Sequence, residues 1–259
     1  MTFIASRDNP RVRRWRALAR DARERRKQRS ALIEGPHLVS ACLDSGTAVK
    51  VLLLSKTGSG RSEFIALARQ SGKSPVVLAD PVFRSIADTE APTGIAAEIA
   101  LPGSTPDLKT STACILLEGI QDAGNVGAIL RSAAAFDIRD AVLGRGCADV
   151  WSPKVLRAAA GAHFAMLFAE GADLAAAIGE FGGKVVCTVP RGGVAITAAD
   201  LSGRIGWIFG GEGQGVRDVL AARATLKVSI PMSGSAESLN VAAAAAICFY
   251  QSSLTGARA

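Results

Sequence analysis

Three polar segments in the C-terminal half of the chain combine residue types that can hold and orient a small polar ligand. They are Leu117–Arg131 (LEGIQDAGNVGAILR), Trp207–Val216 (WIFGGEGQGV) and Ile230–Asn240 (IPMSGSAESLN). Each of the first two segments begins at the end of an apolar run that is typical of a buried strand, and the third comes directly after such a run. The third segment also leads directly into an apolar helix. We therefore expect the three segments to converge on one binding or catalytic site.

The first segment places an amide and a guanidinium on one predicted helix, over residues 125–136. Asn125 stands where a helix N-cap belongs, and Gly127 allows another backbone to approach closely. Arg131 follows six residues later, so it points from roughly the same side of the helix as Asn125. The alternatives are plain helix capping for Asn125 and a surface ion pair for Arg131.

The second segment is a glycine loop that contains a single acid. Four glycines in six residues let the backbone turn tightly against a ligand, and Glu212 lies among them. The loop lacks the dinucleotide fingerprint in its proper place and the lysine of a phosphate loop. The alternative for Glu212 is a solvated turn residue.

The third segment ends at the start of the last helix, predicted over residues 238–254. A helix N-terminus offers free backbone N–H groups and partial positive charge, and Ser238 and Asn240 stand there. Main-chain groups of Ile230 and Met232 are expected at a strand end, where they could bond a base edge. We expect this apolar helix to be buried and the Met232 side chain to pack in the core. The alternative for Ser238 is a helix N-cap with no ligand bound.

The elements that position these segments read as a parallel α/β sheet over residues 111–259. The predicted strands are residues 114–117, 141–143, 163–168, 184–189, 205–209 and 226–230. Helical segments alternate with these nearly continuous apolar strands, a pattern typical of a parallel sheet covered on both faces. Ligands of such sheets bind at the carboxyl ends of the strands, where the polar segments lie.

A smaller α/β domain is predicted over residues 1–102, followed by a turn-rich linker over residues 103–110. Its predicted strands are residues 31–34, 49–54, 75–78 and 94–100, and its predicted helices are residues 35–43, 62–70 and a short one from residue 80. Before them, Asn9-Pro10 opens a basic amphipathic helix in which Val12, Trp15, Leu18 and Ala22 form the apolar stripe.

Positive charge is concentrated in the N-terminal segment. Residues 1–35 carry 11 basic and 4 acidic side chains, which accounts for the whole net charge of +7. Arginine bonds phosphate with two N–H groups and stacks on bases, so we expect contact with RNA rather than a merely solvated helix face. The RNA-binding candidates are Arg11, Arg13, Arg14, Arg25, Arg26 and Arg29.

The amino-acid composition limits the classes of protein to which this chain can belong. At 49% hydrophobic and 20% charged residues, the chain can bury a large core. The five cysteines form no C-x-x-C pair, so we expect buried, reduced thiols without a disulfide framework or metal site. Neither a signal peptide nor an apolar run approaching ~18 residues is present, so we expect a soluble cytoplasmic protein without membrane contact.

Taken together, the motifs resemble those of the SpoU (TrmH-like) RNA 2′-O-methyltransferases of the SPOUT class. The matching patterns are N-x-G-a-x-x-R in Asn125–Arg131, G-x-E-g-x-G in Gly210–Gly215 and I-P-M-x-G-x-x-x-S-L-N in Ile230–Asn240. Order and spacing match over about 140 residues. The front of the chain looks like the ribosomal-protein-like substrate-binding domain that precedes many of these enzymes.

The resemblance implies a fold, a cofactor and an oligomeric state. The C-terminal stretch would form a deep trefoil knot, an exception to unknotted topology. S-adenosylmethionine would lie bent within that knot, and two chains would form a homodimer with the active site at their interface. The cofactor-binding residues implied are Thr188, Gly210, Gly211, Gly213, Ile230, Met232, Leu239 and Asn240.

The resemblance also implies transfer of a methyl group to a ribose 2′-oxygen, for which no metal is needed. The implied catalytic residues are Asn125, Arg131, Glu212, Ser238 and Asn240. A guanidinium pKa above ~12 makes an arginine base costly, so we assign Arg131 to clamping phosphate. Glu212 would orient Arg131 or accept the hydroxyl proton, and by analogy Asn125 and Arg131 could act across the subunit interface.

Several alternatives stay open at the level of sequence. A separate N-terminal domain favours ribosomal RNA over transfer RNA by analogy. A catalytically silent RNA-binding protein of the same fold, or methylation of a base nitrogen, would use the same architecture. A nicotinamide dehydrogenase is disfavoured because the first strand–helix turn lacks the dinucleotide fingerprint.

Overall fold

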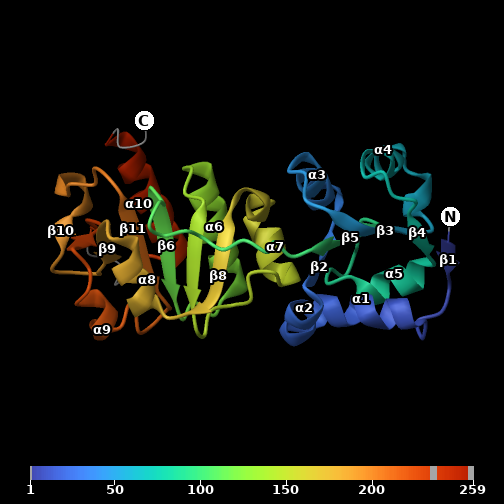
Figure 1. Ribbon diagram of the computed structural model, residues 1–259, viewed down its shortest axis with the longest axis horizontal. Coiled ribbons are helices and arrows are strands. Elements are labelled where there is room, and N and C mark those ends of the chain that lie inside the picture. Colours follow the sequence, from blue (N-terminus) through green and yellow to red (C-terminus); the bar gives the residue numbers. More distant parts are fainter. Residues whose placement is uncertain (1, 234–237, 256–259) are drawn as a thin grey trace. The chain divides into compact units, whose positions relative to one another are not determined.

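A computed structural model describes residues 2–233 and 238–255 of the chain. The chain divides into two compact units (Figure 1). The first comprises residues 1–103 and 151–164, and the second comprises residues 104–150 and 165–259. Each unit has its own β-sheet, and the two are described separately.

The first unit contains a five-stranded mixed sheet in the order β1-β4-β3-β5-β2. Its strands are β1 (Thr2–Ile4), β2 (Ser30–Glu34), β3 (Val49–Ser55), β4 (Val76–Leu78) and β5 (Ile95–Ala100). Strand β5 pairs antiparallel with β2 and β3, whereas β4 pairs parallel with β1 and β3. The four predicted strands of this unit are confirmed. Strand β1 was not predicted, because three residues are too few to show a periodic pattern.

The basic N-terminal segment forms two helices, α1 (Pro10–Arg20) and α2 (Ala22–Gln28), which are packed into the first unit. Val12, Trp15 and Leu18 are buried in one apolar cluster with Phe83 and other side chains of the unit. The helices separate at Asp21, whose side chain accepts the backbone N–H of Arg23. The segment is therefore part of the domain core and could not be removed without exposing that core.

Four further helices belong to the first unit: α3 (Pro36–Asp44), α4 (Ser62–Gln70), α5 (Asp80–Ile86) and α7 (Pro153–Ala159). Helix α7 contacts β2, and its Arg157 forms an ion pair with Asp88. The strand predicted over residues 163–168 is wrong in its position. Residues 162–165 form a 3₁₀ turn in which His163 is buried, and strand β8 begins only at Leu167.

The second unit is built on a seven-stranded sheet in the order β10-β12-β9-β11-β6-β7-β8, and every pairing in it is parallel. The strands are β6 (Ala113–Glu118), β7 (Asp140–Gly144), β8 (Leu167–Ala172), β9 (Lys184–Thr188), β10 (Val194–Ala195), β11 (Ile205–Gly210) and β12 (Leu226–Ser229). The predicted parallel sheet is confirmed.

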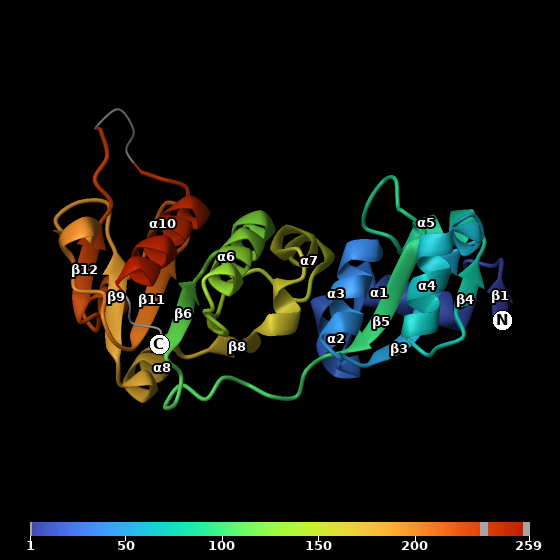
Figure 2. The same ribbon diagram turned by 90° about the horizontal axis from the view of Figure 1, so that it is seen from above.

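Helices cover both faces of this sheet, as the apolar strands require (Figure 2). Helices α8 (Leu174–Phe181) and α9 (Asp218–Ala221) pack on one face, where Ile208 of β11 lies in their apolar cluster. Helices α6 (Ala123–Ala135) and α10 (Val241–Leu254) pack together on the other face, where Phe209 contacts Phe249 edge-on. The alternation of side chains along β11 thus supplies both layers.

Helix α10 is buried along only one face, which corrects the expectation of a fully buried helix. Ala245, Cys248, Phe249 and Ser252 are buried. Ile247, Tyr250 and Leu254 are 38%, 54% and 60% exposed in the single chain. They recur at spacings of three and four residues and therefore form one exposed apolar stripe.

No helix among residues 2–233 and 238–255 is both long and apolar enough to cross a membrane. All five cysteines are free thiols, and burial raises the pKa of Cys42, Cys114 and Cys248 to about 12. Thiols with such pKa values are not nucleophiles near neutral pH. The part of the chain that the structure describes contains no group of three or more His, Cys, Asp or Glu side chains suited to a metal ion.

Candidate functional site

The three polar segments meet in a hydrogen-bonded cluster of Asn125, Glu212 and Asn240. Asn125 donates from Nδ2 to Glu212 Oε1 at 2.5 Å, and Asn240 donates from Nδ2 to Asn125 Oδ1 at 2.9 Å. These residues are separated by 87 and 115 positions in the chain. Because the strands before these segments run parallel, their carboxyl ends bring the segments to one edge of the sheet.

Helix α6 fixes Asn125 in its first turn, and Asp122 rather than Asn125 is the N-cap. The Asp122 side chain accepts the backbone N–H of Asn125 at 2.7 Å. Asp is as good an N-cap as Asn, and it stands three residues earlier, so the helix begins at Ala123. The Asn125 amide is consequently free to bond Glu212 instead of capping its own helix.

Asn240 performs two tasks at once. Its Oδ1 accepts the backbone N–H groups of Ala242 and Ala243, which makes it the N-cap of α10. Its Nδ2 is thereby aimed at Asn125. Helix α10 therefore begins at Val241, later than predicted, and Ser238 precedes the cap.

One pocket, which we call the cofactor-sized pocket, borders this cluster and is lined by all eight residues that the family resemblance implies for a cofactor. The lining residues are Thr188, Val189, Pro190, Gly210, Gly211, Glu212, Gly213, Gly215, Val216, Ile230, Met232, Ser238, Leu239, Asn240, Val241 and Ala244. Backbone-rich loops follow β9, β11 and β12 here, and the first turn of α10 adds aliphatic side chains. This mixture suits an elongated ligand with both polar and apolar parts.

Glycine is required where the loop after β11 folds back on itself. A Cβ atom at Gly210 would lie 2.0 Å from the carbonyl carbon of Gly215, and one at Gly211 would lie 2.5 Å from the carbonyl oxygen of Gly119. Gly211 and Gly215 also form an isolated antiparallel bridge, closed by the Gly215 N–H on the Gly211 carbonyl at 2.9 Å. A side chain at Gly210 would force the glycine loop itself open, and one at Gly211 would push the loop that carries Glu212 away from the segment at Gly119 that leads to Asn125.

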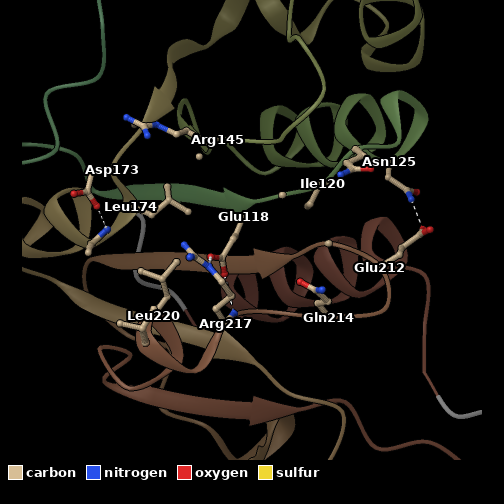
Figure 3. Close-up of a pocket in the computed structure, with 18 of the residues that line it drawn as sticks. Glu118, Ile120, Asn125, Arg145, Asp173, Leu174, Glu212, Gln214, Arg217 and Leu220 are labelled. Carbon is tan, nitrogen blue, oxygen red and sulfur yellow. Dashed lines mark hydrogen bonds and ion pairs between the residues drawn. The ribbon is translucent and has the colours of Figure 1, made fainter.

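A second pocket, whose lining is drawn in Figure 3, shares Gly211, Glu212 and Gly215 with the first. Glu118, at the end of β6, accepts the backbone N–H of Arg217 at 2.9 Å and is also paired with the Arg217 guanidinium. Sequence reasoning missed this pair. An acid ending an apolar strand was the available signal, because such a residue needs a partner when it is buried.

Arg131 does not join the cluster within its own chain. Its side chain is exposed, it lines neither pocket, and it forms no hydrogen bond or ion pair with the described residues. Glu212 therefore does not orient Arg131 in the single chain. Ser238 lines the cofactor-sized pocket, whereas Asn125 lines the second pocket.

The six N-terminal arginines divide into two groups. Arg14 donates to both carboxylate oxygens of buried Glu98 at 2.6 Å, and Arg25 is buried and donates to the Leu18 carbonyl. The Glu98 hydrogen bond and charge raise the pKa of Arg14 above its ordinary value. Both arginines therefore have a role in stabilising the domain, and the Arg25 side chain is buried there. Arg11, which lies over the Trp15 ring, Arg13, Arg26 and Arg29 are exposed and form no ion pair with the described residues, whereas Arg14 is exposed but is paired with Glu98.

Replacing Arg14 with alanine is expected to lower the free energy of unfolding by about 2 to 3 kcal/mol. Glu98 is only 1% exposed, and without Arg14 it would keep just the Trp15 indole N–H as a side-chain donor. Urea unfolding measures the loss. Arg13→Ala is the matched control and should stay within about 0.5 kcal/mol of the native chain; equal losses in the two variants would contradict this division.

Comparisons with known proteins agree with this arrangement. A model of the SpoU rRNA Methylase family matches residues 112–250, and a model of the MRM3-like substrate binding domain matches residues 9–97. The chain is 34% identical to Bacillus subtilis 23S rRNA (guanosine(2553)-2'-O)-methyltransferase RlmP, over 96% of this chain and 98% of that relative. It is 30% identical to Coxiella burnetii 23S rRNA (guanosine-2'-O-)-methyltransferase RlmB, over 85% and 93% of the two chains.

Solved structures share the whole architecture. An rRNA methyltransferase from Sinorhizobium meliloti superposes with a TM-score of 0.84 at 26% identity, covering 97% of this chain and 96% of that one. The same enzyme is also known in an AdoMet-bound form, with the same TM-score. The resemblance expected from the three motifs is confirmed. The chain belongs to the SpoU rRNA methylase family.

Proposed function

We propose that this protein transfers the methyl group of S-adenosylmethionine to a ribose 2′-hydroxyl of ribosomal RNA. The observation that carries the proposal is the Asn125–Glu212–Asn240 cluster at the edge of the cofactor-sized pocket. Family membership and the relatives named for 23S rRNA 2′-O-methylation support the reaction and the substrate. The same matches favour ribosomal RNA over transfer RNA.

The residues of the pocket fit the proposed cofactor. Thr188, Ile230 and Met232 present strand-end groups that can bond an adenine edge, and the glycine loop offers close backbone approach. Leu239 and Asn240 close the pocket from the start of α10. When bound, S-adenosylmethionine supplies an electrophilic methyl group on a good leaving group. The chain must therefore chiefly position the hydroxyl and take up its proton.

Glu212 is the acceptor we assign to that proton. Its Oε1 is held by Asn125, which leaves Oε2 without a partner among the described residues. Asn125 thus orients the carboxylate, and Asn240 orients Asn125. Ser238 borders the same pocket with an exposed hydroxyl that can contact the ribose. Arg131 is assigned to clamping the RNA phosphate.

We further propose that two chains form a homodimer in which Arg131 of one chain serves the site of the other. The exposed apolar stripe of Ile247, Tyr250 and Leu254 on α10 supports an interface there, and α10 packs directly on α6, which carries Arg131. Arg131 has no partner among the described residues of its own chain, which is consistent with a role across that interface.

Replacing Ile247 with aspartate is expected to convert the dimer to a monomer. A charge in the middle of an apolar interface loses burial energy and is left without a partner. Light scattering measures the molar mass. Ile65→Asp is a matched control, because Ile65 on α4 is 37% exposed and Ile247 is 38% exposed. A dimer that persists in Ile247→Asp, or a native chain that is monomeric, would refute this interface.

The exposed arginines Arg11, Arg13, Arg26 and Arg29 are proposed to bind RNA phosphates. Replacing these four with glutamine should weaken RNA binding and reduce the slope of log K against log salt by about 0.7 to 0.9 for each phosphate that is no longer neutralised. Binding titrations at several salt concentrations measure the slope. Arg69→Gln, an exposed arginine on α4, is the control. An unchanged slope in the fourfold variant would show that these side chains do not contact RNA.

The finer architecture is proposed from the family as well. Residues 1–102 would form the RNA substrate-binding domain, residues 103–110 the linker and residues 111–259 the methyltransferase domain. The C-terminal stretch would thread a loop and form a trefoil knot, which family membership and the near-complete match to a solved rRNA methyltransferase support. Because ribosomal RNA is the substrate, the proposed compartment is the cytoplasm.

The proposed substrate is tested by mapping 2′-O-methyl sites in cellular RNA with and without the protein. We expect one ribosomal RNA position to lose its methyl group when the gene is absent and to regain it when the gene is restored. If methyl groups are lost only from transfer RNA, the substrate is transfer RNA and not ribosomal RNA. An unchanged map of 2′-O-methyl sites would refute the proposed function.

A further inference from the structure

We propose that the second pocket receives the base of the nucleotide that is methylated, and that it selects guanine. This inference rests on the proposed function, because it assigns the substrate of that same site. The pocket is formed by the segments that follow β6, β7, β8 and β11. It is distinct from the cofactor-sized pocket and meets it only at the glycine loop.

The position of the pocket matches that of a base. Gly211, Glu212 and Gly215 line both pockets, and Asn125 lines the second one. A ribose hydroxyl facing Glu212 belongs to a nucleoside whose base must lie beside that ribose. Enzymes that act on a nucleotide inside folded RNA commonly turn its base out of the stack into such a pocket.

The lining suits the two faces of an aromatic base. Leu174 and Ala175 of α8 line the pocket together with Val219 and Leu220 of α9. Val219 is 58% exposed, which is unusual for a large apolar side chain. Aliphatic surfaces pack against the faces of a base and leave its edge to polar groups.

The polar groups able to read that edge are Arg145 and Asp173. Figure 3 shows both at the end of the pocket away from Asn125 and Glu212. Asp173 is held in place because its Oδ1 accepts the N–H groups of Ala175 and Ala176, and its Oδ2 has no partner among the described residues. Arg145 likewise forms no hydrogen bond or ion pair within the described chain. Glu118 is not available, since Arg217 occupies both of its oxygens.

A carboxylate and a guanidinium at one end of the same pocket are together complementary to guanine. Guanine is the one standard base whose pairing edge carries two adjacent donors, N1–H and the N2 amino group, next to the O6 acceptor. The one free carboxylate oxygen of Asp173, Oδ2, can accept from both donors in a bifurcated hydrogen bond, and an arginine can donate to O6. Uracil offers one donor, and the amino groups of adenine and cytosine have ring acceptors beside them, which a carboxylate repels.

The test uses a ribosomal RNA fragment that contains the mapped position, with guanosine or inosine there. Inosine lacks only the N2 amino group. We expect inosine to lower kcat/KM of the native protein roughly tenfold or more, because a hydrogen bond to a charged acceptor is removed. Asp173→Asn keeps the helix cap, since Asn caps as well as Asp. It should slow methylation of guanosine and bring the guanosine-to-inosine ratio toward one, with an unchanged Kd for S-adenosylmethionine.

Asp137→Asn is the matched control. Asp137 is exposed, lies outside both pockets and has a φ of +59°, which asparagine tolerates. It should retain the native ratio. A native protein that treats the two substrates equally, an Asp173→Asn variant that keeps the native ratio, or a mapped nucleotide other than guanosine would overturn the inference alone. A native protein that methylates no RNA would instead refute the proposed function on which it rests.

Discussion

Replacing Arg131 with alanine is expected to lower kcat/KM for RNA methylation by about 100-fold or more. The guanidinium is exposed on α6, has no partner in the described chain and lines neither pocket, so its removal should not disturb folding or the cofactor site. Calorimetry should accordingly give an unchanged Kd for S-adenosylmethionine. Arg139→Ala is the control, because Arg139 is also exposed and pairs only with exposed Asp137. Full activity of Arg131→Ala would eliminate the phosphate-clamp role.

Mixing two inactive variants tells whether Arg131 acts on its own chain or on its partner. Arg131→Ala retains Glu212, and Glu212→Ala retains Arg131. If Arg131 crosses the interface, each mixed dimer contains one intact site, and random mixing restores about a quarter of the native sites. If Arg131 acts within its own chain, no mixed dimer has an intact site. Recovery of activity after co-refolding or co-expression decides between the two arrangements.

Replacing Gly210 with alanine is expected to raise the Kd for S-adenosylmethionine by about 100-fold or more. The added Cβ would lie 2.0 Å from the carbonyl carbon of Gly215, which is backbone and cannot rotate away. The loop would have to open, and it forms a wall of the cofactor-sized pocket. Calorimetric titration measures the change.

Gly179→Ala is the matched control for that substitution. Gly179 lies within α8, and a Cβ there would meet no atom within 4 Å. This variant should therefore bind the cofactor with an unchanged Kd. Alanine in a helix interior is favoured over glycine by about 1 kcal/mol, so its free energy of unfolding should rise slightly. An unchanged Kd in Gly210→Ala would show that the glycine loop does not hold the cofactor.

Elements buried on both faces could be predicted from the sequence, and short or edge elements could not. Strands β6, β9 and β11 are apolar in their interiors, because helices cover both sides of the sheet, and their bounds were expected within about two residues. The two-residue strand β10 and the strand at Leu167–Ala172 are partly exposed and have no comparable pattern.

Side-chain roles that depend on distant partners were less accessible. Arg13 and Arg14 are adjacent and chemically identical, yet only Arg14 reaches Glu98, which lies 84 residues away. Asn125 and Asp122 are both suitable N-caps by residue type. Which of them caps the helix depends on the path that the chain takes after the end of β6. The second pocket combines segments whose polar residues form no motif, so only the folded chain reveals it.

The most direct test of the central claim is to identify which atom of the RNA receives the methyl group. Purified protein is incubated with methyl-labelled S-adenosylmethionine and unmethylated ribosomal RNA, and the product is digested to nucleosides for mass spectrometry. We predict label on a ribose 2′-oxygen, and none when Asn125 or Glu212 is replaced by alanine. Label on a base nitrogen, or undiminished ribose labelling in those variants, would contradict the claim that this cluster presents the ribose to the methyl donor.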